Sequence, residues 1–257
     1  MIDGRQGRKS EQAAELAGQS GIRIQPLTEP WTSWKIPADF LSDFQLVPES
    51  WVARSKLENL GYENAVEKLA EKFHVSGDFL RALNPVIRDW NRLREGDVIK
   101  VPRLALRRLP RADHLEIRLS KKIIVAMEEG NRPLASFPCS IAAKKEKRPL
   151  GWLEVRVLVS NPDYLFDPAF FPEAPESAIL ASKLIIAPGP NNPVGTMWIG
   201  LGSTAGGRAL KGIGIHGTPH PEEIGKTESH GCFRMTNWDV QRLATMLRIG
   251  TRILVKE

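Results

Sequence analysis

The order of hydrophobic and polar positions changes character along the chain. Residues 1–46 are rich in Gly, Gln, Ser, Pro and charged residues without sustained periodicity, which predicts a flexible tail and linker. Residues 47–103 contain two helical patterns between short apolar stretches, and residues 113–256 alternate as β-strands do. The basic stretch RLALRRLPRA, residues 103–112, lies between them. The pattern therefore predicts two domains that are separable in function.

Within residues 47–103 the spacing predicts a small β-α-α-β unit. GYENAVEKLAEKF repeats apolar residues at helical spacing, and Ser76 is suited to cap a second helix that ends at Asn84 and Pro85. WVARS before the helices and VIKVP after them are the predicted strands. Residues 47–103 are therefore expected to form a compact mixed unit.

From residue 113 onward the alternation predicts a mainly β domain with one C-terminal helix. EIRLS, KIIVAMEE, LASFPCSI and WLEVRVLVS are predicted strands, separated by charged, Gly or Pro turns. A Pro-rich insertion from Asn161 to about Ser182 has the length of a functional lid or binding wall. Near the end, Asn237 is expected to cap the helix WDVQRLATML, and TRILVK to return as a final strand.

Composition bounds the class of protein without identifying it. With 257 residues and 42% hydrophobic residues, the chain is suited to one large or two modest domains, and neither a disordered nor a fibrous protein fits. The formal net charge of +6 favours an acidic partner such as nucleic acid, an anionic membrane or a carboxylate-rich cell wall. No stretch reaches the roughly 18 to 20 apolar residues of a membrane span, and MIDGRQGRKS lacks the apolar core of a secretory signal.

The two cysteines, Cys139 and Cys232, allow one bridge at most, so no disulfide framework stabilises the fold. Cys139 lies on a predicted strand without a basic residue beside it, and we interpret it as a thiol of the core. Cys232 lies in a different setting. It is close to several histidines and glycines, which makes it the candidate for chemistry.

The stretch GIGIHGTPHPEEIGKTESHGCFRMTN gathers three of the five histidines around one cysteine. A zinc site is one interpretation, but the prolines on both sides of His220 prevent a regular helix from aligning possible ligands, so no metal is predicted. A nucleophilic cysteine explains the cluster better, because a thiol with an ordinary pKa near 8.5 gains from a neighbouring base. The backbone N–H groups of Gly231 and Cys232 are suited to bind the oxyanion that such chemistry creates.

HGT at 216–218 and SHGCFRM at 229–235 resemble the two halves of the catalytic motif of the L,D-transpeptidase (YkuD-type) family. HLEIRLSKKIIVAMEEGNRPLASFPCSIA, PLGWLEV, GPNNPVGTMWIGL and NWDVQRLATMLRIGTRILV extend the resemblance to roughly residues 113–255. One departure from the family pattern is RPLG at 148–151, where the family has a Thr-Pro-x-Gly-like segment. The resemblance implies a YkuD-like β-sandwich.

Carried over residue by residue, the resemblance implies a role for each motif position. Cys232 is the nucleophile, His216 is its base, and the backbone carbonyl of Gly217 orients that imidazole. The substrate-binding residues implied by the motif are His230, Arg234 and Ser229.

AVEKLAEKFHVSGDFLRALNP followed by LREGDVIKVP resembles the LysM domain, and LGYENA departs from that domain's usual first turn. LysM domains bind glycans that contain N-acetylglucosamine. The resemblance implies a glycan-binding module at residues 47–103, and a purely structural helical hairpin is the alternative.

Together the two resemblances imply a cell-envelope enzyme that acts on peptidoglycan stem peptides and glycan strands, with no cofactor, nucleic-acid partner or membrane span. The expected reaction is a two-step acyl transfer through a Cys232 thioester, ending in a 3→3 cross-link, trimming or exchange, and carbapenems are expected to acylate the same thiol. A cysteine endopeptidase of the NlpC type is the nearest alternative, but those enzymes place Cys before His, whereas here His216 comes first. A non-catalytic wall-binding protein is the other alternative.

Overall fold

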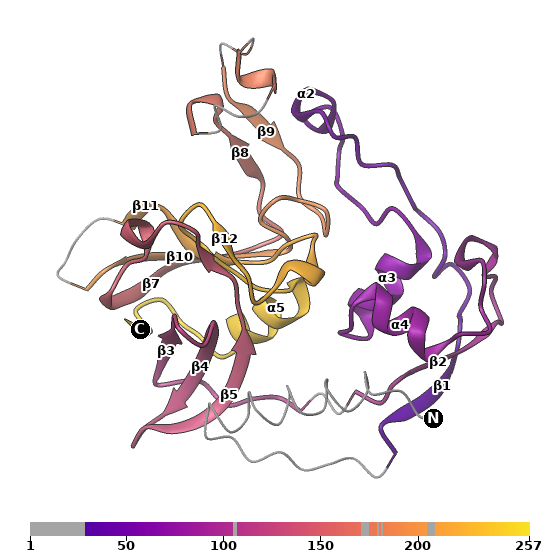
Figure 1. The fold of residues 1–257 in the computed structure, drawn as a ribbon, viewed down its shortest axis with the longest axis horizontal. Helices are drawn as coiled ribbons and strands as arrows, with labels where there is room; N and C mark the ends of the chain where they lie inside the picture. The colour runs from indigo at the N-terminus through magenta and orange to yellow at the C-terminus, as the bar shows by residue number, and fades with distance from the viewer. Residues whose placement is uncertain (1–28, 105–106, 171–174, 179, 181, 205–208) are drawn as a thin grey trace.

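The computed structural model describes residues 29–257 apart from 105–106, 171–174, 179, 181 and 205–208. A helix-containing N-terminal unit stands beside a larger domain built mainly of strands (Figure 1). Residues 1–28 of the predicted tail lie outside the described residues. Among the described helices, none combines the length and the apolar character that crossing a bilayer requires.

The N-terminal unit, residues 31–102, is built around two short helices, and the cap predicted at Ser76 is confirmed. Asn64 caps α3 and Ser76 caps α4, each accepting a hydrogen bond from a backbone N–H of the first turn. Buried side chains from both helices, from β2 and from Ile36 just after β1 form one core. The elements are β1 (Trp31–Lys35), α2 (Trp51–Arg54), α3 (Ala65–Lys72), α4 (Gly77–Leu83), η1 (Trp90–Arg92) and β2 (Val98–Pro102).

The first strand of this unit differs from the prediction. WVARS forms α2, not a strand, because Ser50 accepts a hydrogen bond from Ala53 N and caps the turn. The strand that pairs antiparallel with β2 is β1, in the segment predicted to be tail, with Trp34 opposite Ile99. The short sequence WTSWK mixes polar residues with two tryptophans, so it does not show the apolar pattern of a strand. Trp34 packs against the core of the unit. A strand precedes and a strand follows the two predicted helices, but the predicted first strand is wrong, and α2 adds a helix between the strands.

The mainly β domain, called the sheet domain (residues 112–256), contains one eight-stranded sheet. Its strand order is β13-β11-β10-β7-β14-β3-β4-β5, with parallel pairs β11–β13 and β14–β3 and otherwise antiparallel neighbours. The predicted strands are confirmed. The strands are β3 (His114–Arg118), β4 (Ile123–Glu128), β5 (Arg132–Pro138), β6 (Ile141–Ala142), β7 (Gly151–Ser160), β8 (Tyr164–Phe166), β9 (Leu184–Ile186), β10 (Met197–Ser203), β11 (Ala209–His216), β12 (Thr227–Ser229), β13 (Phe233–Arg234) and β14 (Arg252–Lys256).

The sheet curls until its two edges meet, and the mainly β character predicted for this domain is confirmed. Ser140, just after edge strand β5, forms an antiparallel bridge with Arg234 of the other edge strand, β13. Both backbone hydrogen bonds are present, at 2.8 Å from Ser140 N to Arg234 O and 3.1 Å in return. Short 3-10 helices connect some strands, namely η2 (Lys145–Lys147), η3 (Pro168–Phe170), η4 (Pro175–Ala178) and η5 (Pro221–Glu223). The closure fixes β13, and with it the end of the cysteine motif.

Helix α5 (Asn237–Thr245) packs against β10 and β11, and its buried residues join the core inside the curled sheet. Its cap is Thr236, whose hydroxyl accepts from Asp239 N, so the predicted cap at Asn237 is wrong by one residue. Thr236 takes this place because its extended backbone precedes the first helical residue. Asn237 is left with a buried amide that bonds outside its own helix.

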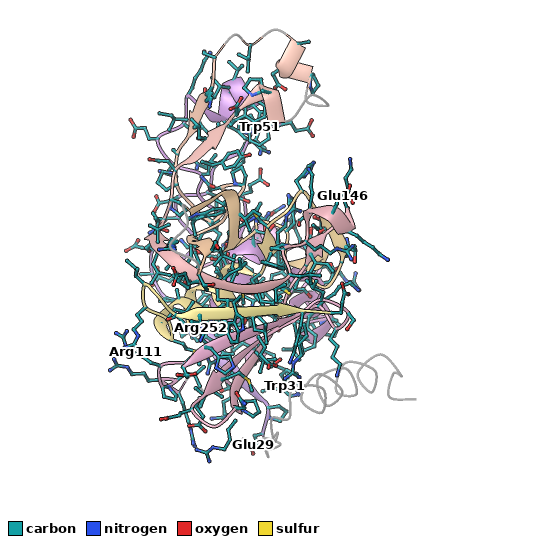
Figure 2. All side chains as sticks on the ribbon, turned by 90° about the vertical axis from the view of Figure 1, so that its left-hand side faces the viewer. Glu29, Trp31, Trp51, Arg111, Glu146 and Arg252 are labelled. Atoms are coloured by element: carbon teal, nitrogen blue, oxygen red, sulfur yellow. The ribbon has the colours of Figure 1, made fainter. Side chains whose placement is uncertain are left out.

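The Pro-rich insertion contributes a hairpin of β8 and β9, in which Tyr164 pairs with Ile186. An N-terminal arm, residues 45–61, lies along this hairpin. Trp51 stacks on Phe166 with 4.3 Å between ring centroids, and Figure 2 shows Trp51 close to the hairpin ribbon. Leu60 is fully buried in the same cluster. The arm therefore completes a small core that the hairpin lacks on its own.

The N-terminal unit also touches the sheet domain near α5. Asn237 donates to Glu71 at 3.0 Å, Asn191 donates to Glu67 at 2.6 Å, and the rings of His74 and Trp238 stack. These contacts join the two parts directly, beyond the chain that connects them. The prediction from the basic stretch at 103–112 was that the two domains function separately. The contacts between them favour the opposite expectation, that removing one affects the other.

Candidate active site

The motif residues meet where parallel strands β11 and β13 run side by side. His216 is paired with Arg234, and Ile215 with Phe233. Because paired residues of neighbouring strands point to the same face, His216 and Arg234 share one face of the sheet. Cys232 precedes β13 and lies beside Gly214, whose backbone hydrogen-bonds its sulfur. The pairing of β11 with β13 thus brings together the two halves of the motif, which a loop separates in the sequence.

His216 is held in one orientation at the end of β11. Its Nδ1 lies 2.6 Å from the carbonyl oxygen of Gly217, and its ring stacks on Trp198. A carbonyl oxygen only accepts, so Nδ1 carries the proton. Burial lowers the pKa of His216 to about 4, and the ring is therefore neutral at physiological pH. It follows that Nε2 is unprotonated and has a basic lone pair.

Cys232 is partly exposed, and its thiol lies against the glycine-rich backbone of β11. The sulfur donates to the carbonyl oxygen of Gly212 at 3.1 Å. Burial raises the pKa of Cys232 to about 11, opposed by the Gly214 backbone and by the charge of Arg234. The resting side chain is therefore a neutral thiol, which needs a base to become a nucleophile.

The turn before Cys232 is held by Ser229. Its buried hydroxyl donates to the carbonyl oxygen of Cys232 at 2.5 Å and accepts from Gly231 N at 3.4 Å. These bonds stay within the turn, so a substrate contact by Ser229 stays a prediction. The oxyanion role of the Gly231 N–H also stays a prediction. To bind an oxyanion, this N–H must give up its 3.4 Å hydrogen bond to the Ser229 hydroxyl. His230 is exposed and precedes Cys232 by two residues.

Arg234 faces both candidate catalytic groups, since its charge lowers the pKa of His216 and of Cys232. Its guanidinium lies 3.7 Å from the carboxylate of Glu228. Tyr164 of the hairpin also belongs here: burial raises its pKa to about 12, with further contributions from Cys232 and Arg234. Sequence reasoning missed Tyr164 beyond its place in the predicted lid, because its approach to Cys232 depends on the path of the insertion.

The remaining cysteine and histidines lie apart from this cluster. Cys139 is fully buried in the sheet-domain core, as predicted, and burial raises its pKa to about 12. His220 is exposed and 3.4 Å from Glu222. Within the described part of the chain, no three His, Cys, Asp or Glu side chains are grouped as a metal site would require.

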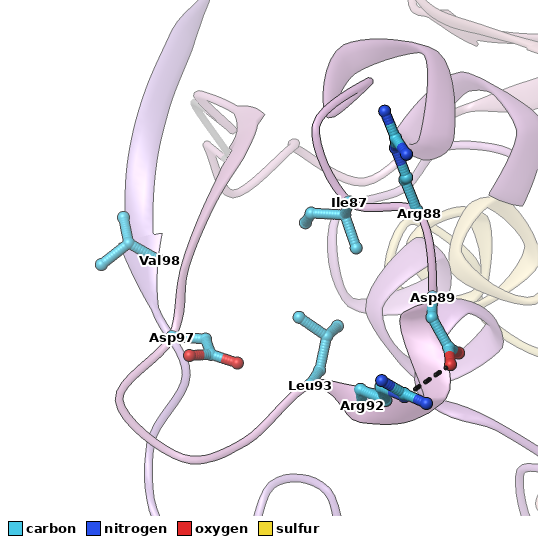
Figure 3. Close-up of a pocket in the computed structure, with 7 residues that line it drawn as sticks. All are labelled: Ile87, Arg88, Asp89, Arg92, Leu93, Asp97 and Val98. Atoms are coloured by element: carbon cyan, nitrogen blue, oxygen red, sulfur yellow. Dashed lines mark ion pairs between the residues drawn. The ribbon is translucent and has the colours of Figure 1, made fainter.

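A hollow lies on the N-terminal unit, in the loop that joins α4 to β2 (Figure 3). It is an open pocket of about 340 Å³ with a mixed apolar and charged wall. Arg92 and Asp89 form an ion pair at its edge, 3.1 Å apart. None of its lining residues belongs to the cysteine cluster; they are Ile87, Arg88, Asp89, Arg92, Leu93, Asp97 and Val98.

Comparison with protein families identifies the sheet domain. The family model of the L,D-transpeptidase catalytic domain, YkuD, matches residues 112–255, more than half of the chain. The chain therefore belongs to the L,D-transpeptidase catalytic-domain family. The expected resemblance of the sheet domain is confirmed, and the LysM resemblance of the N-terminal unit stays a prediction.

Two curated relatives are L,D-transpeptidases by name. YqjB of Bacillus subtilis is 39% identical over 82 residues, 32% of this chain and 46% of that protein. YkuD of Bacillus licheniformis is 41% identical over 68 residues, 26% of this chain and 37% of that protein. The matches thus span less than half the length of either relative.

Solved structures with a related chain path include an L,D-transpeptidase from Mycobacterium smegmatis, with a TM-score of 0.40 and 15% identity over 65% of this chain and 76% of that one. An Enterococcus faecium L,D-transpeptidase has a TM-score of 0.40 and 16% identity over 57% and 50%.

Proposed function

We propose that this protein is a peptidoglycan L,D-transpeptidase of the cell envelope, with Cys232 as its nucleophile and His216 as its base. The observation that carries the proposal is the bond from His216 Nδ1 to the Gly217 carbonyl, in a domain of this family. That bond leaves Nε2 free to take a proton. The substrate proposed is a stem peptide with a diamino acid at its third position.

In the first step, the Cys232 sulfur attacks the carbonyl carbon at the L-centre of the diamino acid, and His216 Nε2 takes the thiol proton. A tetrahedral oxyanion forms, for which backbone N–H groups at Gly231 and Cys232 are the proposed donors. The C–N bond to the terminal D-alanine then breaks. The amine of D-alanine leaves with the proton from His216, and a thioester remains on Cys232.

In the second step, an amine from another stem peptide attacks the thioester carbon. His216 Nε2 takes the proton of that amine, the C–S bond breaks, and the proton returns to sulfur. The product is a 3→3 cross-link. Water as acceptor yields a trimmed peptide, and a free amino acid yields an exchanged one. Arg234 is the proposed receptor for a stem carboxylate, because a guanidinium pairs with carboxylates through two hydrogen bonds.

Mass spectrometry of purified tetrapeptide muropeptides after incubation with the full chain tests this function. We expect release of D-alanine and 3→3-linked dimers with the wild type, and neither with Cys232→Ser. His216→Ala should lose roughly 10²- to 10⁴-fold in acylation rate, the usual effect of removing a general base. His230→Ala, a neighbouring histidine variant, should lose much less.

Three results would contradict the proposal. Products cut elsewhere in the peptide would favour a cysteine endopeptidase. An inert but folded wild type would favour a wall-binding protein without catalysis. A loss in His230→Ala that exceeds the loss in His216→Ala would reassign the base.

We further propose that the N-terminal unit binds glycan strands at its open pocket. Ile87 and Leu93 supply apolar surface, and Arg92 supplies hydrogen-bond donors, a combination suited to a sugar ring. Sedimentation of the full chain with intact sacculi should weaken in Arg92→Ala. It should not change in Asp78→Ala, a control at an exposed acid of the same unit. Equal sedimentation of all three proteins would refute this pocket as the glycan site.

A further inference from the structure

We propose that Glu71, on helix α3 of the N-terminal unit, is a positioning residue for the active site of the sheet domain. It acts through Asn237, which supports the peptide of Gly217, and Gly217 in turn orients His216. This inference rests on the function proposed above, since it assigns His216 the part of the base. It makes the N-terminal unit a component of the active site rather than a carrier for it.

The first contact is between the side chain of Asn237 and two glycines, Gly195 and Gly217. The side chain of Asn237 is 1% exposed, and its Oδ1 accepts from Thr196 N at 3.2 Å. A Cβ placed on Gly195 would lie 2.0 Å from this oxygen, and one placed on Gly217 would lie 2.2 Å from it. No side chain fits at either position. Asn237 thus lies directly against the Gly217 backbone, and only glycine permits that approach.

The second contact sets which way the amide of Asn237 faces. Its Nδ2 donates to Glu71 Oε2 at 3.0 Å and to the carbonyl oxygen of Pro190 at 3.1 Å. Both partners are acceptors when Glu71 is ionised. A flipped amide would turn its oxygen toward these two oxygens and its NH₂ toward Thr196 N–H, losing every bond. Glu71 therefore helps to hold Oδ1 against the glycines.

Glu71 is itself fixed. Its carboxylate is hydrogen-bonded to the hydroxyl of Tyr62, and it stands on α3, whose N-terminus is capped by Asn64. Burial raises the pKa of Glu71, while the bonds from Asn237 and Tyr62 lower it. The carboxylate is thus a half-buried group with two specific partners, as a positioning role requires.

The last contact reaches the base. Gly217 donates from its N–H to Met197 O at 3.2 Å, and its carbonyl oxygen accepts from His216 Nδ1 at 2.6 Å. Strand β10 therefore holds the N–H side of Gly217, and Asn237 packs on its α-carbon. If the amide of Asn237 loses its orientation, the carbonyl gains freedom, and the Nδ1-protonated tautomer of His216 loses its partner.

A pair of neutral, size-matched variants of the full chain tests the proposal. Glu71→Gln keeps an acceptor for Asn237, and Glu71→Met keeps the length of the side chain but removes the acceptor. Nitrogen-15 spectra of labelled histidine report the tautomer of His216 without substrate. We expect Glu71→Met to shift the tautomer ratio of His216 by roughly two- to tenfold, the effect of one lost hydrogen bond. Glu71→Gln should stay near wild type, as should the surface control Asp78→Ala.

A wild-type His216 spectrum in folded Glu71→Met would overturn the inference, as would equal shifts in Glu71→Met and Glu71→Gln. If Glu71→Met does not melt cooperatively, Glu71→Asp is the second variant, because it retracts the acceptor by one methylene and keeps the charge. A wild-type spectrum there overturns the inference, and a shifted one supports it. Failure of the proposed function is seen separately, as absence of acyl transfer in the wild type.

Discussion

Leu60 offers the sharpest test of the contact between the N-terminal arm and the hairpin. Its side chain is 0% exposed and belongs to a cluster with Phe166 and Ile186 of the hairpin strands. Leu60→Ala removes that packing and leaves the backbone in place. The hairpin carries Tyr164, which neighbours Cys232, so the effect should extend from stability to the site.

The cost depends on how far the cavity can collapse. Both backbone groups of Leu60 are bound, its N–H to Pro188 O at 2.8 Å and its carbonyl to Asn191 N at 3.0 Å. Gly189 packs so closely that an added Cβ would lie 2.2 Å from the Leu60 carbonyl oxygen. Because the backbone has no room to move inward, we expect the upper part of the Leu→Ala range, about 3–5 kcal/mol.

Thermal unfolding followed by circular dichroism measures this cost. For a chain of this size, the loss corresponds to a fall in Tm of roughly 6–20 °C. Leu46→Ala is the matched control, because Leu46 is 84% exposed on the same arm and its truncation should cost less than about 0.5 kcal/mol. Equal melting of the two variants would refute the packing of the arm on the hairpin.

Three further predictions follow from the same contacts and charges. A chain reduced to residues 104–257 should melt well below the full chain and turn over muropeptides more slowly, and full activity after truncation would restore the picture of independent domains. Iodoacetamide should modify Cys232 increasingly as pH rises toward about 11, and leave Cys139 unmodified in the folded protein, as peptide mass spectrometry will show. Arg234→Gln should shift the Cys232 alkylation midpoint upward, because the positive charge lowers that pKa, and should raise KM more than it lowers kcat; an unchanged midpoint would contradict this.

Much of the fold was predictable because its signals are local. The helices α3 and α4 carry caps and spacing that need no partner to be recognised. Strand β7 begins with an alternation of buried and less buried residues, and β4 is a continuous apolar run. Strand β1 was missed because WTSWK becomes a strand only through pairing with β2. WVARS has the composition of a strand, but the cap at Ser50 makes it helical. In both segments the composition was a weaker determinant of structure than a specific interaction, namely strand pairing for β1 and the cap at Ser50 for α2.

The candidate site divides along the same line. The motif placed Cys232, His216 and Arg234 in one short stretch, and the sheet then paired the last two across β11 and β13. Tyr164 and Glu71 were not predictable, because one arrives through the fold of an insertion and the other from a different unit. Asn237 was noticed only as a helix cap, since its local role concealed a long-range one.

The charge of Arg234 has opposite consequences for the two ends of the proton transfer. It lowers the pKa of Cys232, which favours the thiolate, and it lowers the pKa of His216, which disfavours the imidazolium. For a proton that moves from sulfur to Nε2, the two effects oppose each other, and Arg234 contributes little to the transfer. A substrate carboxylate that neutralises Arg234 therefore leaves the difference between the pKa values of Cys232 and His216 nearly unchanged. Arg234 can thus bind an anionic substrate without weakening His216 as the base.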